Sequence, residues 1–141
     1  MENDYFTLEF EVRDYECDLS GIVNNAVYQN YLEHARHRFL KTRGLDFATL
    51  EEQGVTLVVI RIEMDFLFPL QRGDKFYVRV IPERISRLRF GFQQDIFRMP
   101  DEKPILAAKL IGTALNKQGR PRLPREIEEQ LMSSFEAGQI K

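Results

Sequence analysis

The feature that most constrains the fold of this 141-residue chain is a change of hydrophobic period near Gly54. Before it, apolar residues recur at i, i+3, i+4, i+7 and i+11 from Tyr28 to Phe39, which is one stripe of an amphipathic helix. After it, apolar and charged residues alternate from Thr56 to Phe68, as in a long strand with one buried face. A helix and a strand of this kind bury their apolar faces by packing together, so the chain predicts an α+β domain.

The rest of the chain extends this pattern without an interdomain linker, so residues 1–141 are expected to form a single domain. Asp14–Asn25 is aperiodic and predicts a loop, and Asn24 or Asn25 then caps a helix that ends at Gly44. A further helical turn or two is expected in Leu45–Gln53, and a short amphipathic helix in 125–137. The predicted strands are Phe6–Val12, Thr56–Phe68, Phe76–Val80, Leu88–Ile96 and Ile105–Asn116. One main helix leaves sheet edge and surface uncovered, which favours a homo-oligomer.

Composition excludes several classes of protein. Lys and Arg number 20 against 22 Asp and Glu, so bulk electrostatic binding to nucleic acid is not expected. A single cysteine, Cys17, excludes an internal disulfide framework and a multi-cysteine metal site. The longest uncharged stretch, Leu19–Leu32, contains several amides, and the first residues lack the pattern of a signal peptide. We therefore expect no membrane span and a cytoplasmic location.

The segment Val12–Arg36 resembles the signature of hotdog-fold thioesterases of the 4-hydroxybenzoyl-CoA thioesterase family. The signature positions are occupied here by Val12, Arg13, Glu16, Asp18, Gly21, Val23, Tyr28, Glu33, Ala35 and Arg36. The later stretches EMDFLFPLQRGDKFYV and GRPRLP resemble a strand–turn and a C-terminal turn of the same family. The resemblance implies a five-stranded antiparallel sheet wrapped around the helix Asn25–Arg43. It also implies dimers paired edge to edge, often stacked into tetramers, with active sites at the dimer interface.

The resemblance further implies an acyl-CoA thioesterase in which Asp18 acts as nucleophile or as general base; the sequence leaves both roles open. The oxyanion site is then the backbone N–H of Asn25 at the start of the helix. Asn25 stands where family branches carry His or Tyr, and its amide cannot transfer protons at pH 7. Gly21, Val23 and Tyr28 are the expected substrate-binding positions, although Gly21 is equally well explained as a turn glycine.

Other reactive side chains are expected to be structural. Cys17 follows the alternation of an extended segment and should point away from Asp18, into packing. His34 and His37 are three residues apart, but the sequence is not a zinc-binding H-E-x-x-H, and His37 should face solvent. Glu33 resembles the helix carboxylate of other hotdog thioesterases and is expected to be structural here. No metal and no cofactor is expected, since CoA is part of the substrate.

Two groups of arginines could hold the CoA phosphates, since guanidinium groups suit phosphate. They are Arg84, Arg87 and Arg89 in one segment and Arg120 and Arg122 in another, beside Arg125; a solvated face is the other interpretation. An acyl carrier protein carries the same phosphopantetheine arm and is an alternative to CoA. A hydratase or dehydratase is disfavoured because Val23 stands where a D-x-x-x-x-H motif needs His. A non-catalytic acyl-thioester binder is the remaining alternative.

Overall fold

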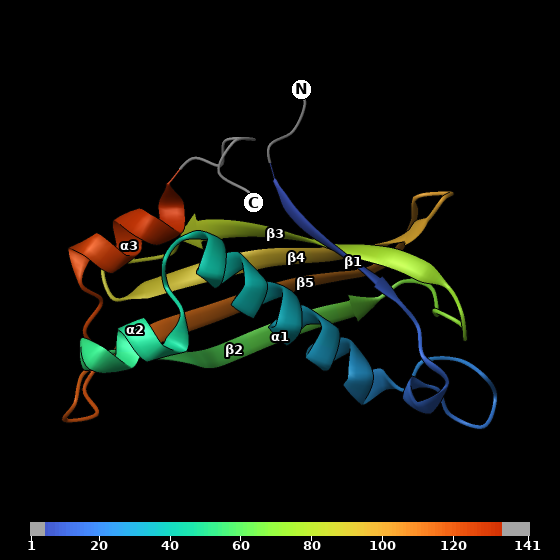
Figure 1. Cartoon of the computed structure of the whole chain (residues 1–141), viewed down its shortest axis with the longest axis horizontal. Helices are drawn as coiled ribbons and strands as arrows, with labels where there is room; N and C mark the ends of the chain where they lie inside the picture. The colour runs from blue at the N-terminus through green and yellow to red at the C-terminus, as the bar shows by residue number, and fades with distance from the viewer. Residues whose placement is uncertain (1–4, 134–141) are drawn as a thin grey trace.

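A computed structural model describes residues 5–133 of the chain. A five-stranded antiparallel sheet with the order β1-β3-β4-β5-β2 curves around one long helix, α1 (Figure 1). The elements are β1 Phe6–Glu11, a 3₁₀ turn η1 Asp14–Glu16, α1 Asn25–Thr42, α2 Phe47–Glu52, β2 Thr56–Phe66, β3 Lys75–Arg84, β4 Arg89–Met99, β5 Lys103–Leu115 and α3 Arg125–Met132. The expected α+β hotdog architecture is confirmed.

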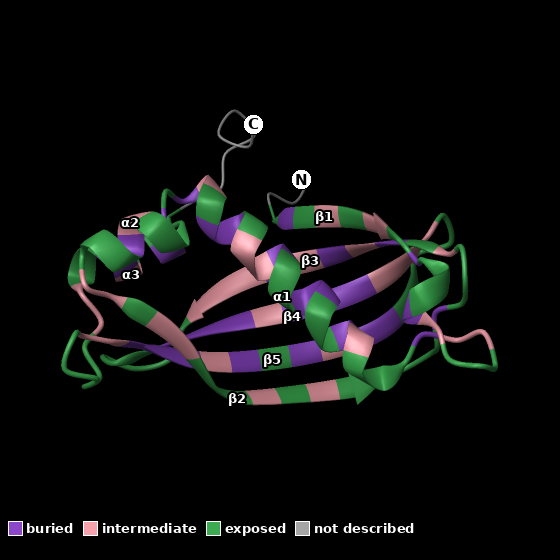
Figure 2. Ribbon diagram, turned by 60° about the horizontal axis from the view of Figure 1, so that its bottom comes forward, coloured by how far each residue is buried: buried purple, intermediate pink, exposed green. Residues whose placement is uncertain are grey.

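The central helix begins and ends where local chemistry requires. The Asn24 side chain accepts a hydrogen bond from the Ala26 N–H at 2.9 Å and so caps α1. Gly44 follows the helix with a φ of +73°, a left-handed conformation that favours glycine. The buried side chains of α1 form the expected stripe: Tyr28, Tyr31, Leu32, Ala35, Phe39 and Leu40. The stripe belongs to the core cluster that it shares with β3 and β4, and α1 lies across the concave side of the sheet (Figure 2).

We expected the strand Thr56–Phe68 to bury one alternating apolar face, and this prediction is wrong for the first half of the strand. The pairing of β2 with β5 shifts between Val59 and Arg61, which marks a β-bulge. One extra residue reverses the alternation, so Leu57 and Ile62 both pack against the core although they are an odd number of residues apart. Val59 pairs with Gly112, borders a hollow beside α1 and is 49% exposed.

Two other boundaries differ from expectation. The strand β3 continues through Pro82 to Arg84, whereas we expected it to end near the proline. Within residues 5–133, β1 pairs with β3 only as far as Val80, and the described partner of Pro82 is Phe92 of β4; a strand position with one paired side tolerates proline. The helix expected at 125–137 is described as α3 up to Met132, and its last expected residues lie outside the described part of the chain.

Each edge of the sheet ends in a strand with one open side, β1 at one edge and β2 at the other. The β2 edge and the turn after it carry five large apolar side chains that are 41–53% exposed: Val59, Ile60, Phe66, Leu67 and Phe68. An apolar open edge of this kind favours pairing with another strand. Within residues 5–133, no helix is both long enough and apolar enough to cross a membrane.

Candidate functional site

Asp18 lies at the tip of a small antiparallel hairpin that precedes α1. Cys17 forms a bridge with Val23, and the Asp18 N–H donates to the Ile22 carbonyl at 2.9 Å. The turn closes with the Gly21 N–H donating to the Asp18 carbonyl at 3.0 Å, and Gly21 has a φ of +84°. A Cβ atom on Gly21 would meet no atom within 4 Å, so its backbone conformation is the reason for glycine here. Of the two interpretations of Gly21, the geometry supports the turn.

The carboxylate of Asp18 is exposed and stabilised in its ionised form. Its Oδ1 accepts hydrogen bonds from the Ser20 N–H at 2.9 Å and from the Ser20 hydroxyl at 2.7 Å. These bonds, the hydroxyl first, hold the pKa of Asp18 below its usual value. Our sequence analysis missed Ser20, although the Asp-x-Ser spacing of an Asx turn could have indicated it.

The backbone N–H of Asn25 is the open donor at the start of α1. Asn24 takes the next two donors, since its side chain accepts from Ala26 and its carbonyl accepts from the Val27 N–H at 2.9 Å. As the first helical residue, Asn25 has no acceptor within the helix for its own N–H, and the residue is exposed. The positive end of the helix dipole adds to the attraction of this N–H for a developing negative charge.

Glu16 joins this hairpin to the helix, a role that the sequence did not indicate. Its side chain is 8% exposed, and Oε1 accepts from the Tyr31 hydroxyl and from the Arg13 N–H, each at 2.8 Å. The Glu16 carbonyl accepts from the Asn24 N–H at 3.0 Å. The segment that carries Asp18 and the residue that caps α1 are therefore held by one buried residue.

Val23 and Tyr28, expected at the substrate, are each only 3% exposed in the single chain. The Tyr28 hydroxyl accepts from the Leu70 N–H at 3.1 Å, and its ring lies 5.6 Å from that of Phe66. The Val23 N–H donates to the Leu70 carbonyl at 2.9 Å. These two residues fix the Asp18 hairpin and the start of α1 to the chain that follows β2.

The remaining reactive side chains lie elsewhere. Cys17 packs partly against the core, and burial raises the pKa of its thiol. His34 lies edge-on to Phe10, whereas His37 is half-buried against Phe47 at 4.6 Å, so the expectation that His37 faces solvent is wrong. The reason is that α2 folds back against the helix. Among residues 5–133, no group of three or more His, Cys, Asp or Glu side chains is placed to hold a metal ion.

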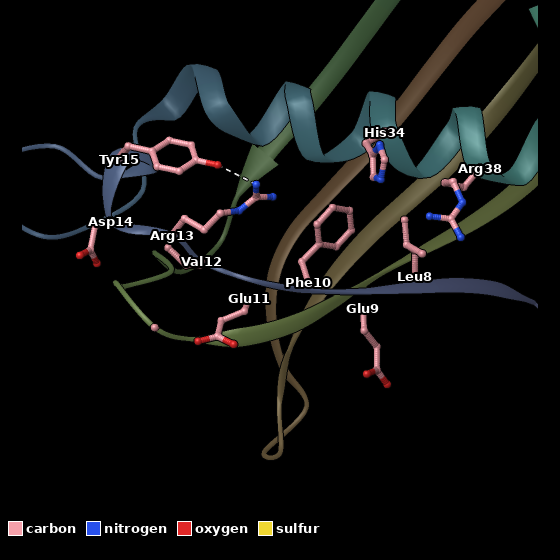
Figure 3. A pocket seen from close by; sticks show the side chains of 11 residues that line it. Leu8, Glu9, Phe10, Glu11, Val12, Arg13, Asp14, Tyr15, His34 and Arg38 are labelled. Atoms are coloured by element: carbon pink, nitrogen blue, oxygen red, sulfur yellow. Dashed lines mark hydrogen bonds between the residues drawn. The ribbon is translucent and has the colours of Figure 1, made fainter.

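Hollows lie on both sides of α1. A groove of about 740 Å³ lies between β1 and α1. Figure 3 shows that Leu8 and Phe10, which line it, point toward the helix. This groove contains neither Asp18 nor Asn25. A second hollow, of about 410 Å³, lies on the β2 side of α1 and is mainly apolar. Its lining residues are Glu33, Arg36, His37, Leu40, Phe47, Leu57, Val58, Val59, Phe90, Phe92 and Leu110.

The arginines expected to bind phosphate lie at the far end of the sheet from Asp18 of the same chain. The strand β3 begins beside the Asp18 hairpin, where the Arg72 N–H donates to the Gly21 carbonyl at 3.2 Å. It spans 10 residues and ends at Arg84, which puts the two ends roughly 30 Å apart at the usual rise of a strand. Arg84, Arg87, Arg89, Arg120 and Arg122 are all exposed at that far end. A single chain therefore does not bring them to Asp18.

Residues 12–134 match the model of the thioesterase-like superfamily. The acyl-acyl carrier protein thioesterase ATL3 of Arabidopsis thaliana is 40% identical over 131 residues, covering 92% of this chain and 69% of that protein. A 1,4-dihydroxy-2-naphthoyl-CoA hydrolase of Picosynechococcus is 28% identical, covering 84% of this chain and 86% of the hydrolase. The crystal structure of a hypothetical protein from Aquifex aeolicus superposes with a TM-score of 0.82 at 27% identity, over 89% of this chain and 98% of that one.

Proposed function

The chain belongs to the thioesterase-like superfamily of hotdog-fold thioester hydrolases, and from this premise we propose that it cleaves acyl groups from a phosphopantetheine thiol, with Asp18 as the reacting carboxylate. One observation carries the proposal: an exposed, ionised carboxylate and an open helix N–H lie on one rigid hairpin–helix junction. Asp18 supplies the nucleophile or base, and Asn25 supplies the donor.

The chemistry follows from these two groups. The thioester carbonyl oxygen accepts from the Asn25 N–H, which stabilises the oxyanion as the carbonyl is attacked; such a donor is typically worth about 10²–10³ in rate. Asp18 either attacks the carbonyl carbon, forming an acyl anhydride that water then hydrolyses, or takes a proton from the attacking water. The sulfur leaves as a thiolate in both routes and needs little help from an acid.

The active assembly in this proposal is a homodimer formed through the open edge of β2. Antiparallel pairing of two β2 strands buries the exposed apolar side chains of Val59, Ile60 and Phe66. It places the start of one β2 opposite the end of the other. The Asp18 hairpin is fixed to the chain after β2 through Leu70, and the apolar hollow borders Leu57 and Val59 near the start of β2. The hairpin of one protomer therefore comes to the hollow of its partner.

We assign the acyl group to that hollow. Its wall has apolar residues from five elements, and its volume of about 410 Å³ lies in the range of small-molecule pockets, about 300–1,000 Å³. The substrate carrier is CoA or an acyl carrier protein, since relatives of this chain are named for each. A cytoplasmic location and stacking of two dimers into a tetramer remain part of the proposal.

Replacing Asp18 with Asn tests the assignment. We expect kcat on acyl-CoA to fall about 10²-fold or more, because the amide is neither a nucleophile nor a base. Asp14→Asn is the matched control, since Asp14 is an exposed carboxylate in the same segment whose partner is Arg72. Near-normal turnover by a folded Asp18→Asn protein would refute the proposal.

A single turnover in H₂¹⁸O tests the nucleophilic role of Asp18. If water attacks the anhydride at the Asp18 carbonyl carbon, peptide mass spectrometry detects ¹⁸O in the Asp18 carboxylate, and the first released acid carries an unlabelled oxygen from Asp18; this result establishes Asp18 as the nucleophile. Label that enters only the released acid excludes attack at the Asp18 carbonyl carbon and is the result expected of a general base.

A further inference from the structure

The end of the sheet opposite Asp18 carries two segments that are rich in arginine and contain no acidic residue. One is the β3–β4 turn with its flanking residues, 84–89, and the other is the connection from β5 to α3, 117–125. Together they hold Arg84, Arg87, Arg89, Lys117, Arg120, Arg122 and Arg125, which is seven of the 20 Lys and Arg residues of a chain whose net charge is −2. This concentration of positive charge has no role in the site described above.

The fold brings the two segments side by side. Arg89 pairs with Thr113 of β5, whose hydroxyl donates to the Leu88 carbonyl at 2.6 Å. Just beyond this point Pro121 bridges Leu115, and the Arg122 N–H donates to the Ala114 carbonyl at 2.7 Å. β2 occupies the other side of β5 as far as Leu115. β4 begins at Arg89, so it does not reach beyond Thr113 of β5 at this end of the sheet. Residues 121–122 therefore occupy the next position beside β5, close to the β3–β4 turn.

Apolar side chains are interspersed among these cations. Ile85 is 43% exposed and Leu88 is 36% exposed, and both lie between arginines in the turn. An apolar contact bordered by arginine is the composition typical of protein interfaces, whereas phosphate is held by cations that converge on a point. Arg84 forms an ion pair with Glu128 at 3.6 Å, so its charge is partly neutralised. The positive charge of the surface therefore comes mainly from its other arginines and Lys117.

We propose that this surface, residues 84–89 and 117–125, docks an acidic acyl carrier protein that delivers the acyl thioester. The inference rests on the proposed function and names the macromolecular carrier of its substrate. The positive potential attracts the acidic face of the carrier, and Ile85 and Leu88 supply the apolar contact. In the proposed dimer, antiparallel pairing puts this surface at the same end of the assembly as the partner's Asp18 hairpin. The phosphopantetheine arm then bridges the surface and the reacting carboxylate.

The test compares three thioesters of one acyl group: decanoyl-acyl carrier protein, decanoyl-CoA and decanoyl-pantetheine, the last of which has neither protein nor nucleotide. Arg87→Ser/Arg122→Ser should lower the ratio of kcat/KM on the carrier to kcat/KM on decanoyl-pantetheine by about tenfold or more. Leu88→Ser should lower the same ratio. The control Arg38→Ser/Lys109→Ser removes the same charge from exposed positions outside the surface and should leave the ratio within about twofold of the unmodified protein.

Ionic strength provides a second readout. For the unmodified protein, kcat/KM on the carrier should fall between about 0.01 M and 0.15 M salt, as the Debye length shortens from about 30 Å to about 8 Å. The Arg87→Ser/Arg122→Ser variant should show a smaller dependence. Fluorescence anisotropy of labelled carrier protein should give the same order of affinities without turnover.

Three results would overturn the inference. One is an unchanged carrier ratio in the double variant, and another is failure of the unmodified protein to bind the carrier in the anisotropy measurement. The third is a fall in kcat/KM of the double variant on decanoyl-CoA as large as its fall on the carrier, which would assign the arginines to the nucleotide phosphates. Carrier binding that depends on Arg87 and Arg122 without hydrolysis of any thioester would support the docking surface and refute the proposed function instead.

Discussion

The bond between Glu16 and Tyr31 should be worth about 1 kcal/mol more than a neutral hydrogen bond. Glu16 is buried, and its carboxylate accepts the Tyr31 hydroxyl at 2.8 Å. A hydrogen bond to a charged group typically contributes about 1.5–3 kcal/mol, against about 0.5–1.5 for a neutral one. Tyr31→Phe should therefore cost about 2 kcal/mol in the unmodified protein but only about 1 after Glu16→Gln, a coupling of about 1 kcal/mol.

The substitutions suit a double-mutant cycle because they change little else. Phe at position 31 keeps the ring contacts with Phe10 at 5.4 Å and Phe76 at 4.7 Å, and Gln keeps the volume of Glu. Urea unfolding of the four proteins, followed by circular dichroism, gives the coupling. All four are measured at one protein concentration, since an oligomer gains apparent stability with concentration.

Glu16 should also affect catalysis, because it precedes Asp18 by two residues and accepts the Asn24 N–H through its carbonyl. We expect each single substitution to lower kcat more than it raises KM, as loosening the hairpin displaces the reacting carboxylate. Additive effects within about 0.3–0.5 kcal/mol would refute the claim that this bond holds the hairpin.

Four further predictions follow from the hairpin and the open edge. Ser20→Ala removes a bond that lowers the pKa of Asp18, so the acid limb of kcat/KM should move to higher pH; an unmoved limb would contradict the assignment. Cys17→Ser should keep most activity, and iodoacetamide should inactivate slowly, because burial raises the thiol pKa; a dead Cys17→Ser protein with an active Asp18→Asn protein would reverse their roles. Ile60→Lys should dissociate the proposed dimer, as measured by light scattering, and abolish activity with it. Gly21→Ala should destabilise the protein to urea by about 1–2 kcal/mol, because its φ is +84°.

Local signals in the sequence determined the elements and indicated Asp18 as the candidate carboxylate. The stripe from Tyr28 to Phe39 and the asparagines before it predicted α1, because helix burial and capping depend on residues within a few positions of one another. The aperiodic segment Asp14–Asn25 predicted a loop before the helix, and the structure shows that Cys17–Val23 forms a small hairpin within it. These predictions needed no knowledge of distant contacts.

Only the tertiary structure decided what depends on non-local neighbours. The bulge at Val59–Arg61 arises from the pairing of β2 with β5. It reverses which residues in the first half of β2 face the core, and the alternation in the sequence does not show where this happens. Glu16 is buried and joins the hairpin to α1, because the Tyr31 hydroxyl of the helix donates a hydrogen bond to its carboxylate. Two arginine segments about 30 residues apart in the chain are neighbours, because residues 121–122 lie beside β5 just beyond the first residue of β4. Both segments lie far from Asp18 of the same chain. Hydrophobic period and capping are encoded locally, whereas register, burial of a charge and proximity of loops are set by strand pairing across the whole chain.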